Sequence, residues 1–420
     1  MRTPRPLWLR WLLRIALSLT ALAVTGFVWL FFLGGVAISD RVMLWRMIRG
    51  ESVAAPTAAV VASQLRAAPG YEVAIFASDL PSARVLVVAA GGQILLSQPR
   101  GGLVTALEPD RDGDGRSDGR RVLFSGLDRP NGLDLHEGYL YVAEATQIIR
   151  IPFDSQTATV TGERQVVVAG LTADGTHWRK TVRIGPDRAL YVGQGSTCNV
   201  CIEADSRRAT LMRWAREGGE VGEVGEFGEG EVLASGTRNP YGFDWAPWDQ
   251  SLYATENGRD LLGDDLPPDE LNRIVQGGFY GWPFRHGRDI VDPEYGATPD
   301  PRVLRTLAPA HEFGAHTAPL GMRFLRHSAR PQAYARTALV ALHGSWNRST
   351  PAGYAVVALD FDADGRISER SFLEGFRNAD GLIGRPVDVV EGGDGAIYVS
   401  DDYAGVIYRV RALPSSSNGG

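Results

Sequence analysis

Cysteine is scarce in this chain of 420 residues, which has only Cys198 and Cys201, in the motif CNVC. Two thiolates cannot complete a four-ligand zinc site. The next residue is Ile202, so the histidine that a c-type haem attachment needs is also missing. A local disulfide in an oxidising compartment is the favoured interpretation, and a redox-active pair is the alternative.

Runs of positive charge are missing from the body of the chain, and the formal net charge is −6. Nucleic acid is bound through clustered lysine and arginine side chains, so this composition speaks against nucleic acid as the main partner. A small molecule is the expected ligand.

Charge of either sign is absent between Ile15 and Ser39. This stretch is long enough to cross a hydrocarbon core of about 30 Å. The positive-inside rule places residues 1–14 in the cytoplasm, because they carry four arginines and no acid: Arg2, Arg5, Arg10 and Arg14. We therefore expect an inner-membrane anchor over residues 15–39, with the rest of the chain in the periplasm. A signal peptide that is cleaved after small residues such as Ala37 is the alternative.

Glycine and proline are abundant, with 50 and 24 residues, and they punctuate short apolar runs. This pattern is typical of an all-β chain with many turns and argues against a helical bundle. We expect a linker over residues 40–68, a folded domain over 69–412 and a disordered tail over 413–420.

One unit of three short strands, separated by Gly/Asp turns, recurs six times in the folded domain. The units begin at Arg84, Asn131, Thr181, Tyr241, Gly321 and Pro386. Repeated antiparallel units predict a six-bladed β-propeller, whereas a β-sandwich would not explain the recurrence. The strand YEVAIFA, from Tyr71, is expected to close the ring by joining the C-terminal blade.

Five of the six blade entrances, where a loop leads into the innermost strand, carry a cationic or protonatable side chain. These are Arg129, His177, Arg238, His316 and Arg385. Together they would suit a planar or multiply anionic ligand, because arginine pairs with carboxylates through two parallel hydrogen bonds. The alternative is that each one caps a strand or pairs with a nearby acid.

Histidine is the side chain best suited to accept a proton near neutral pH, and the chain has only seven. His177 stands among cations, which would keep its pKa low, so we expect it to act as a general base. His316 is a competitor, and His286 and His343 are weaker candidates.

Two acidic segments are candidates for binding a hard cation. Residues 110–118, DRDGDGRSD, begin like an EF-hand loop, but Arg121 replaces the bidentate glutamate, so an Asx-rich turn is the competing interpretation. The insertion at 255–283 offers carboxylates and carbonyls, and both a calcium site and an elaborate turn remain open there. The acidic run at 218–231 is expected to lengthen a solvated loop.

At these residues the sequence resembles the soluble quinoprotein sugar dehydrogenases, which use pyrroloquinoline quinone (PQQ) and include glucose, aldose and sorbosone dehydrogenases. The resemblance runs from about Tyr71 to Val410. It rests on IGPDRALYV after His177 and on TRNPYGFDW, DELNRIVQGGFYGWP and GRPVDVVEGGDGAIYVSD. The segments VGQGSTCNVC and ALHGSWNRS look closest to the sorbosone dehydrogenase branch.

The resemblance implies that PQQ lies across the mouth of a six-bladed propeller. His177 would take a proton from a sugar hydroxyl while hydride passes to the quinone, and Arg238 would stabilise the charge on the quinone oxygen. Backbone carbonyls of Gly258 and Arg259 would hold Ca²⁺, which acts as a Lewis acid. Further contacts to the cofactor would come from Asn239, His316, Thr317 and Arg385.

The chain departs from the better-known members at two positions. Gly344 stands near the place where they offer a lysine to the cofactor, and Gly314 stands where they stack an aromatic ring on the quinone. His316 and Thr317 would then have to replace that ring.

The leading hypothesis is a PQQ- and Ca²⁺-dependent dehydrogenase that oxidises an aldose or a sugar-derived aldehyde and passes electrons to an external acceptor. The first alternative is a calcium-dependent, lactonase-type hydrolase in which a histidine activates water. The second is a non-catalytic propeller that binds a protein or glycan. The ring of cations favours the dehydrogenase, because the carboxylates of the quinone need arginines and a neutral lactone does not.

Overall fold

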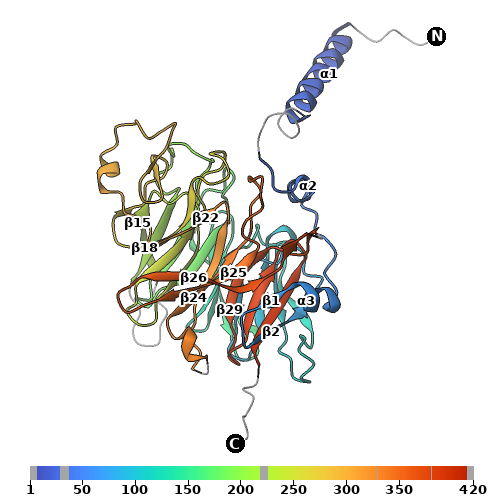
Figure 1. The fold of residues 1–420 in the computed structure, drawn as a ribbon, viewed down its shortest axis with the longest axis vertical. Helices are drawn as coiled ribbons and strands as arrows, with labels where there is room; N and C mark the ends of the chain where they lie inside the picture. Colours follow the sequence, from blue (N-terminus) through green and yellow to red (C-terminus); the bar gives the residue numbers. More distant parts are fainter. Residues whose placement is uncertain (1–6, 29–36, 218–225, 329, 380, 414–420) are drawn as a thin grey trace, which may run out of the picture.

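The structure, a computed structural model, describes residues 7–28, 37–217, 226–328, 330–379 and 381–413. Its body consists of six sheets of mainly antiparallel strands, and several of these strands are labelled in Figure 1. The innermost strands contact one another in the order β3, β7, β12, β16, β23 and β29, and β29 contacts β3 again. The sheets therefore form a closed ring, and the predicted six-bladed β-propeller is confirmed.

The first three blades follow the chain from the innermost strand outward. Blade 1 consists of β3 (Leu86–Val88), β4 (Ile94–Gln98), β5 (Leu103–Leu107) and β6 (Arg120–Phe124). Blade 2 consists of β7 (Leu133–His136), β8 (Tyr139–Ala143) and β9 (Ile148–Asp154), with β10 (Thr159–Val160) and β11 (Gln165–Val168) both paired to β9. Blade 3 consists of β12 (Lys180–Ile184), β13 (Leu190–Gln194), β14 (Thr210–Glu217), β15 (Glu226–Ser235) and β19 (Gly278–Phe279).

The last three blades complete the ring. Blade 4 consists of β16 (Pro240–Trp245), β17 (Leu252–Glu256), β18 (Pro268–Ile274) and β22 (His311–Ala315). Blade 5 consists of β23 (Pro319–Phe324), β24 (Thr337–Leu342), β25 (Ala355–Phe361), β26 (Ile367–Glu374) and β1 (Arg66–Ala67). Blade 6 consists of β29 (Pro386–Glu391), β30 (Ile397–Asp401), β31 (Val406–Ala412) and β2 (Tyr71–Ala77).

Short elements decorate the loops between the blades. Two small hairpins pair β20 (Arg285–His286) with β21 (Ile290–Val291), and β27 (Arg377–Asn378) with β28 (Gly381–Leu382). Three 3₁₀ turns are η2 (Pro99–Gly101), η3 (Pro301–Arg305) and η4 (Gln332–Tyr334). In the predicted solvated loop at 218–231, residues 218–225 lie outside the described residues, and residues 226–231 belong to strand β15.

Strand β2 closes the ring, as the sequence predicted. It pairs antiparallel with β31, in a register that places Tyr71 opposite Ala412. The N-terminal strand of the propeller thereby completes the C-terminal blade and becomes its outermost strand. The core lies between neighbouring blades. The cluster of Phe76, Leu96, Tyr398 and Ile407, for example, joins blade 6 to blade 1.

Glycine lets innermost strands approach one another closely near the axis. A Cβ added at Gly132 would lie 2.5 Å from the backbone nitrogen of Val182 in the next blade. A Cβ added at Gly242 would lie 2.2 Å from the carbonyl oxygen of Leu320. A larger residue at either position would push the blades apart.

The predicted membrane anchor over residues 15–39 is not supported. Helix α1 (Leu7–Val28) stands apart from the propeller in Figure 1 and includes charged residues near its start. Within the described parts of the chain, no helix combines the length and the apolar character needed to span a membrane. Residues 29–36 of the predicted span lie outside the described residues.

The segment expected to be a linker, residues 40–68, has structure of its own. It contains α2 (Arg41–Arg49), α3 (Ala58–Gln64) and β1, and Met43 and Val61 are buried in the hydrophobic cluster of blades 5 and 6. At the other end, Leu413 donates a backbone hydrogen bond to Gly70, and residues 414–420 of the expected tail lie outside the described residues.

Replacing Phe76 by alanine should destabilise the propeller at its closing seam. Phe76 is 1% exposed, and its ring packs edge-on against Tyr398 at 4.9 Å. Truncation of such a buried ring costs about 3–5 kcal/mol of unfolding free energy. The control is Val122→Ala on the outer strand β6, which is 57% exposed and should change stability by less than about 0.5 kcal/mol. Urea unfolding of both variants measures the difference, and equal stabilities would contradict the closing role of β2.

Candidate active site at the channel mouth

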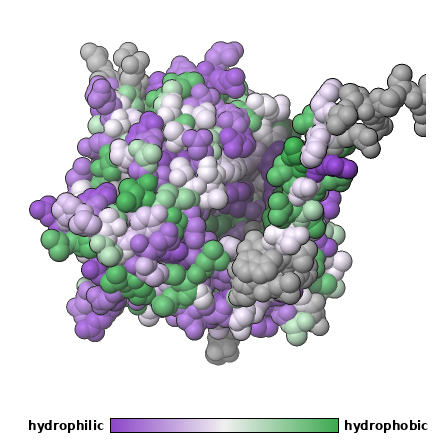
Figure 2. All heavy atoms as spheres, turned by 90° about the horizontal axis from the view of Figure 1, so that it is seen from above, coloured by the Kyte–Doolittle hydropathy of each residue, from purple (hydrophilic) through white to green (hydrophobic). Residues whose placement is uncertain are grey.

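A polar cavity lies where the loops that enter the innermost strands meet. It has a volume of about 270 Å³, and its wall includes His177, Asn239, Tyr241 and Arg385. A second cavity of about 150 Å³ adjoins it, since both are lined by His177, Asn257, Ala318, Gly344 and Trp346. Figure 2 shows a hollow on this face of the molecule. His177 therefore borders both compartments of one site.

The larger compartment has a cationic wall formed by Arg84, Arg100, Arg179 and Arg385. Arg84 and Arg385 are only 4% and 2% exposed. The Nε atoms of Arg84 and Arg179 are buried and have no hydrogen-bond partner among the described residues. Burial, followed by repulsion from Arg84, lowers the pKa of Arg179 to about 10. Other arginines of the described chain, such as Arg183 and Arg330, also bury an Nε–H without a hydrogen-bond partner, but here four guanidinium groups share one wall, so the wall is suited to a ligand that brings negative charge.

Acidic and aromatic neighbours fix Arg84. Its two Nη atoms donate to Asp402 at 2.6 Å and to the hydroxyl of Tyr241 at 2.8 Å. On its other side, Asp402 lies 2.9 Å from Nε2 of His343. Burial, followed by repulsion from Arg385, lowers the pKa of His343 to about 4, so this imidazole is neutral at ordinary pH.

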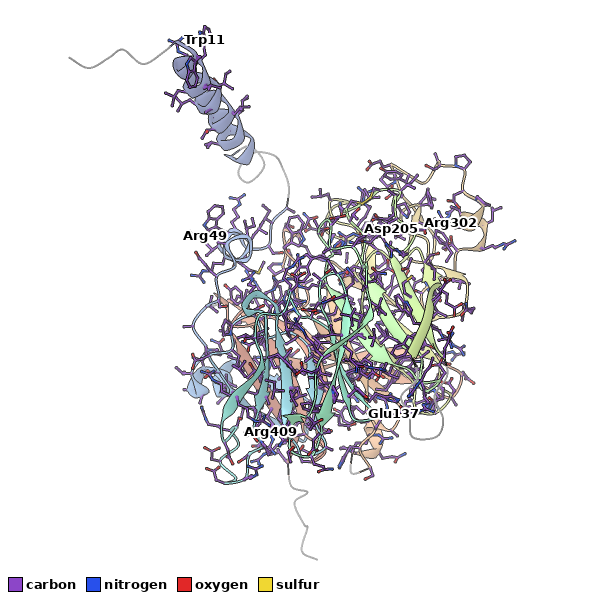
Figure 3. The ribbon with its side chains drawn as sticks, turned by 180° about the vertical axis from the view of Figure 1, so that it is seen from behind. Trp11, Arg49, Glu137, Asp205, Arg302 and Arg409 are labelled. Carbon is purple, nitrogen blue, oxygen red and sulfur yellow. A yellow bond between two sulfur atoms is a disulfide. The ribbon has the colours of Figure 1, made fainter. Side chains whose placement is uncertain are left out.

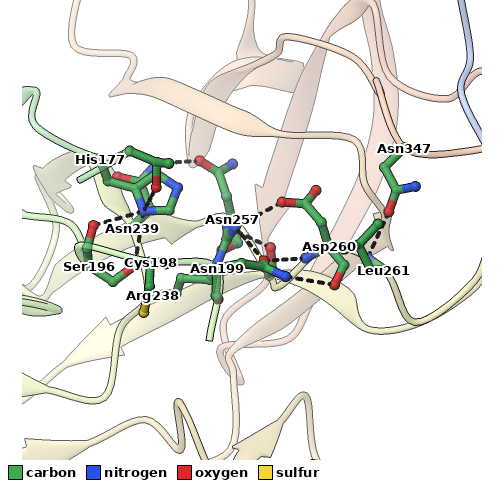
Figure 4. A network of polar contacts seen from close by, with 12 residues as sticks. His177, Ser196, Cys198, Asn199, Arg238, Asn239, Asn257, Asp260, Leu261 and Asn347 are labelled. Atoms are coloured by element: carbon green, nitrogen blue, oxygen red, sulfur yellow. Dashed lines mark hydrogen bonds and ion pairs between the residues drawn. The ribbon is translucent and has the colours of Figure 1, made fainter. Parts of the chain in front are cut away.

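His177 is held in one tautomer by Ser196, two residues after the end of strand β13. Its Nδ1 lies 3.1 Å from the carbonyl oxygen of Ser196 and 2.9 Å from the hydroxyl, as Figure 4 shows. A carbonyl can only accept, and the Ser196 hydroxyl donates its proton to the carbonyl of Cys198 at 2.7 Å. Nδ1 must therefore carry the hydrogen, which leaves Nε2 as the acceptor.

The electrostatic surroundings keep His177 unprotonated. Burial and then the guanidinium of Arg238 hold the pKa of His177 well below its usual range. Arg208 and Arg179 act in the same direction, whereas the hydrogen bond to Ser196 opposes them. An imidazole that is neutral and has a free Nε2 is suited to accept a proton from a ligand.

All the donor groups of Arg238 form hydrogen bonds with residues of two loops, and Figure 4 shows them beside His177. Its Nη1 donates to the carbonyls of Asn257 and Gly258, at 3.1 and 2.8 Å. Its Nη2 contacts Asp260 and the side chain of Asn199, each at 2.9 Å, and its Nε donates to the backbone of Asn199. The guanidinium thus fixes two loops against each other at the smaller compartment.

The disulfide predicted between Cys198 and Cys201 is present. It closes the short loop that presents Cys198 to Ser196 and Asn199 to Arg238. Neither cysteine is free. The loop therefore supports both of the side chains that the sequence assigned to catalysis.

The residues predicted to hold calcium meet in part. The carbonyl of Gly258 already accepts from Arg238, but a carbonyl oxygen has two lone pairs, so one remains for a cation. The side chain of Arg259 points away and pairs with Asp292 at 2.6 Å, so only its backbone can serve. Asp269 is buried in the smaller compartment, and burial raises its pKa to about 6.

Asp269 joins the loop of Gly258, which was predicted to hold calcium, to the loop that contains His316 and Thr317. It accepts hydrogen bonds from the backbone of Gly258 at 2.7 Å and of Ala318 at 2.8 Å, and from Thr317 at 3.2 Å. His316 lines the smaller compartment, and its Nε2 donates to the carbonyl of Gly263 at 2.8 Å. The structure therefore brings His316 to the site and places the Thr317 hydroxyl on Asp269.

Most of the side chains predicted from the blade entrances do meet. His177, Arg238, His316 and Arg385 line the two compartments, and Asn239 lies beside His177, with its amide donating to Asn257 at 2.8 Å. Arg129 lines neither compartment. It pairs with Asp128 at 3.1 Å and packs over the ring of Trp178, as the alternative interpretation expected.

The sequence reasoning missed part of the site. Arg84 occupies the sixth entrance, directly before β3, but was counted as the first residue of its strand unit. Arg179 is one of the cations beside His177 in the sequence, and it was not expected to line the cavity. The position of Arg84 in the repeat could have identified it. Trp346 lies in the segment ALHGSWNRS that carried the resemblance, whereas nothing in the local sequence marks Arg100 or Asp402 as parts of the wall.

In the acidic loop at 110–118, the carboxylate of Asp110 is already engaged by groups of the protein itself. Asp110 accepts hydrogen bonds from Gly113 and Gly115 and pairs with Arg409 at 2.8 Å. Asp110, Asp112 and Asp118 do place carboxylate oxygens within 4.8 Å of one another. The hydrogen bonds to the backbone are those of the Asx-rich turn that the sequence offered as the competing interpretation.

Comparison with known proteins shows which family this chain resembles. A family model described as TrAA12-like matches residues 65–273 and 300–412. A pyrroloquinoline quinone-dependent pyranose dehydrogenase from Coprinopsis cinerea is 26% identical, over 86% of this chain and 56% of that protein. An uncharacterised protein from Borreliella burgdorferi is 40% identical, over 43% of this chain and 48% of that protein. The chain thus spans about half the length of the curated relatives it matches.

A solved structure shares the fold. The holo form of the PQQ domain of the pyranose dehydrogenase from Coprinopsis cinerea superposes with a TM-score of 0.67 and 22% identity. The alignment covers 83% of this chain and 97% of that domain. At this level of identity the likeness supports the propeller architecture.

The geometry around His177 makes a prediction for nuclear magnetic resonance. In protein labelled with ¹⁵N-histidine, His177 should show the neutral Nδ1–H tautomer at pH 6.5, because its pKa is depressed. Its signals should shift only as the pH falls well below that value. Loss of the signal in His177→Gln assigns it. Titration at or above pH 6.5, or the Nε2–H pattern, would contradict the proposed hydrogen bonding.

Proposed function

The chain belongs to the TrAA12-like family, and from this premise we propose that it is a PQQ-dependent dehydrogenase that oxidises a sugar. The family match agrees with the resemblance to the PQQ-dependent sugar dehydrogenases that the sequence motifs suggested. The observation that carries the proposal is the cationic wall beside the neutral imidazole of His177. Such a pairing provides a place for a polyanionic cofactor next to a base.

The wall fits the carboxylates of PQQ. Arg84 and Arg179 each bury an Nε–H without an acceptor, and Arg385 and Arg100 stand on the same wall. Carboxylates would satisfy these donors and offset the repulsion among the guanidinium groups. When bound, the quinone accepts the two electrons and the hydrogen that leave the sugar carbon as hydride.

The residues of the chain would handle the proton. Nε2 of His177 would accept it from the sugar hydroxyl as the C–H bond breaks, and the low pKa of His177 keeps Nε2 free to do so. Arg238 lies near enough to lower that pKa and would also stabilise negative charge developing beside it. Ser196 holds the ring so that Nε2 stays available to the ligand.

Calcium is a second part of the proposal. The smaller compartment contains Gly258, Asp260 and Asp269, which provide the oxygen atoms that a hard cation requires. Gly258 and Arg259 would contribute backbone carbonyls, while Asp260 balances the positive charge of Arg238. A hydrolase or a simple binding module is less well supported, because neither needs several buried arginines around a base.

The substrate proposed is a neutral aldose in its ring form, with a sugar-derived aldehyde as the finer possibility suggested by the sorbosone-like motifs. Loss of hydride from the anomeric carbon to the quinone, and of the proton of its hydroxyl to His177, would yield a lactone. Electrons would then pass to an external acceptor.

Reconstitution tests this function. The full chain, purified without cofactor, should oxidise aldoses in a dye-linked assay only after PQQ and Ca²⁺ are added. His177→Gln should still bind PQQ in equilibrium dialysis but lose about 10²–10⁴-fold in kcat, the usual contribution of a general base. Because the pKa of His177 is depressed, the acid side of the wild-type pH profile should lie well below 6.5.

The control for this experiment is His327→Gln. His327 lines neither compartment and contacts the backbone of Gly393 at 3.1 Å, so its replacement should leave turnover unchanged. PQQ binding without oxidation of any sugar would refute the proposed dehydrogenase activity. Absence of PQQ binding would refute PQQ as the cofactor.

We extend the proposal to the cellular location of the protein. Disulfides persist in oxidising surroundings, so the Cys198–Cys201 bond supports export, for instance to the periplasm. Protein taken from intact cells should react with a maleimide of defined mass only after reduction, at two positions. Labelling of both cysteines without reductant would contradict export.

A further inference from the structure

Residues 37–53, which precede the region matched by the family model, pack along the rim of the channel mouth. The backbone N–H of Ser39 donates to the carbonyl of Trp346 at 2.9 Å, and that of Val53 donates to Tyr403 at 2.9 Å. Trp346 and Tyr403 both line the larger compartment. The segment is therefore attached at both ends to walls of the candidate site.

The middle of the segment, helix α2, is packed against the propeller. Asp40 accepts from the N–H of Met43 at 2.9 Å at the start of the helix and pairs with Arg377 at 3.3 Å. Met43 is 0% exposed, and its sulfur lies 3.6 Å from the hydroxyl oxygen of Tyr354. Figure 1 shows α2 at the edge of the propeller, between α1 and the sheets. A buried anchor and a charged pair make α2 a fixed element of the rim.

A tight turn after α2 brings the chain to the cavity. Gly50 has a φ of 73°, and a Cβ added there would lie 3.0 Å from the guanidinium carbon of Arg100. The next residue, Glu51, donates its backbone N–H to Arg46 at 2.9 Å and lines the larger compartment. The turn at Gly50 thus leads the chain past Arg100 and brings Glu51 to the cavity wall.

Glu51 differs from the other acid of this wall. Among the described residues that line the compartment, only Glu51 and Asp402 are acidic, and Asp402 is engaged by Arg84 and His343. The ion pair of Glu51 with Arg49, at 2.9 Å, joins side chains that are 44% and 57% exposed. Such exposed pairs contribute little, so the carboxylate can exchange this partner for a ligand. Figure 3 labels Arg49 on α2.

We propose that Glu51 recognises the substrate by accepting hydrogen bonds from sugar hydroxyls, with the ring of Trp346 packing against the apolar face of the same sugar. This inference rests on the proposed function. Trp346 borders both compartments together with His177, so a sugar held between Trp346 and Glu51 would lie beside the base. Carboxylates accept strongly from hydroxyls, and aromatic rings pack against C–H faces.

The charge of Glu51 also selects among sugars. Once the carboxylates of the cofactor meet the arginines, Glu51 presents negative charge to the substrate. A sugar that carries its own carboxylate would be repelled, which is a repulsive element of specificity. The site should therefore prefer neutral aldoses to uronic acids.

The test compares the wild type with Glu51→Gln, both as full chains loaded with PQQ and Ca²⁺, on glucose and on glucuronic acid. Loss of a charged acceptor should raise KM for glucose roughly ten-fold, with a smaller effect on kcat. Discrimination against glucuronic acid should fall, and this fall should be largest at low salt. A merely structural defect would not change the preference between the two sugars.

Glu72→Gln is the matched control. Glu72 is also 44% exposed and also pairs with an arginine, Arg411, but it lies on β2 and lines neither compartment. Its replacement should leave both sugars unaffected. An unchanged KM and an unchanged preference in Glu51→Gln would overturn the inference, as would a loss of PQQ affinity, because Glu51 would then serve the cofactor.

Direct sugar binding separates this inference from the proposed function. Isothermal titration calorimetry of the loaded wild type should detect glucose binding that is weakened in Glu51→Gln. A wild type that binds PQQ but neither binds nor oxidises glucose or other aldoses overturns both proposals. A wild type that oxidises them, beside a variant that binds them equally well, overturns only the role of Glu51.

Discussion

Hydrogen bonds from one blade to the next, accepted by aspartates on alternate innermost strands, hold the ring together at its axis. Asp134 accepts from Ile184, Asp244 from Phe324 and Asp388 from Leu86, at 2.7, 2.9 and 2.9 Å. A carboxylate binds a backbone N–H more strongly than a neutral acceptor does, and more so where little water enters. These bonds tie each of three blades to the one that follows it. The entrance loops can reach a common rim only if the ring is closed, and so the site depends on these contacts.

Burial of several arginines around one cavity is costly unless each meets an acid or a carbonyl. Burial would raise the pKa of Asp402, but His343 and Arg84 hold it well below its usual range. Arg385 donates to the carbonyls of His343 and Gly344 at 2.9 and 2.6 Å. The protein therefore satisfies much of its own charge. The buried Nε–H groups of Arg84 and Arg179 have no acceptor among the described residues of the protein. A polyanionic ligand would supply acceptors for them and reduce the repulsion among the guanidinium groups.

The repeat made the propeller and its closing strand predictable from the sequence, because each blade contains its own strands and turns and contacts mainly its neighbours. Equivalent positions in the repeat also predicted that His177 and Arg385 would meet. The repeat could not separate Arg129 from them, since its contacts with Asp128 and Trp178 depend on local packing. The contribution of residues 37–53 was unpredictable, because the segment has no strand periodicity and its partners, such as Trp346 and Tyr403, are far away in the sequence.

The loop closed by the disulfide holds the imidazole of His177 and the guanidinium of Arg238 as one unit. Ser196 and Cys198 fix the imidazole of His177, and Asn199, one residue later, accepts two hydrogen bonds from Arg238. A Cβ on Gly195 would lie 2.5 Å from both His177 and Asn239, so the base has little room to move. Proton transfer requires donor and acceptor to lie within hydrogen-bond distance, and small errors in placement are costly. A disulfide beside these residues limits such errors for His177 and Arg238 together, which gives the CNVC motif a positional role that needs neither a metal nor redox chemistry.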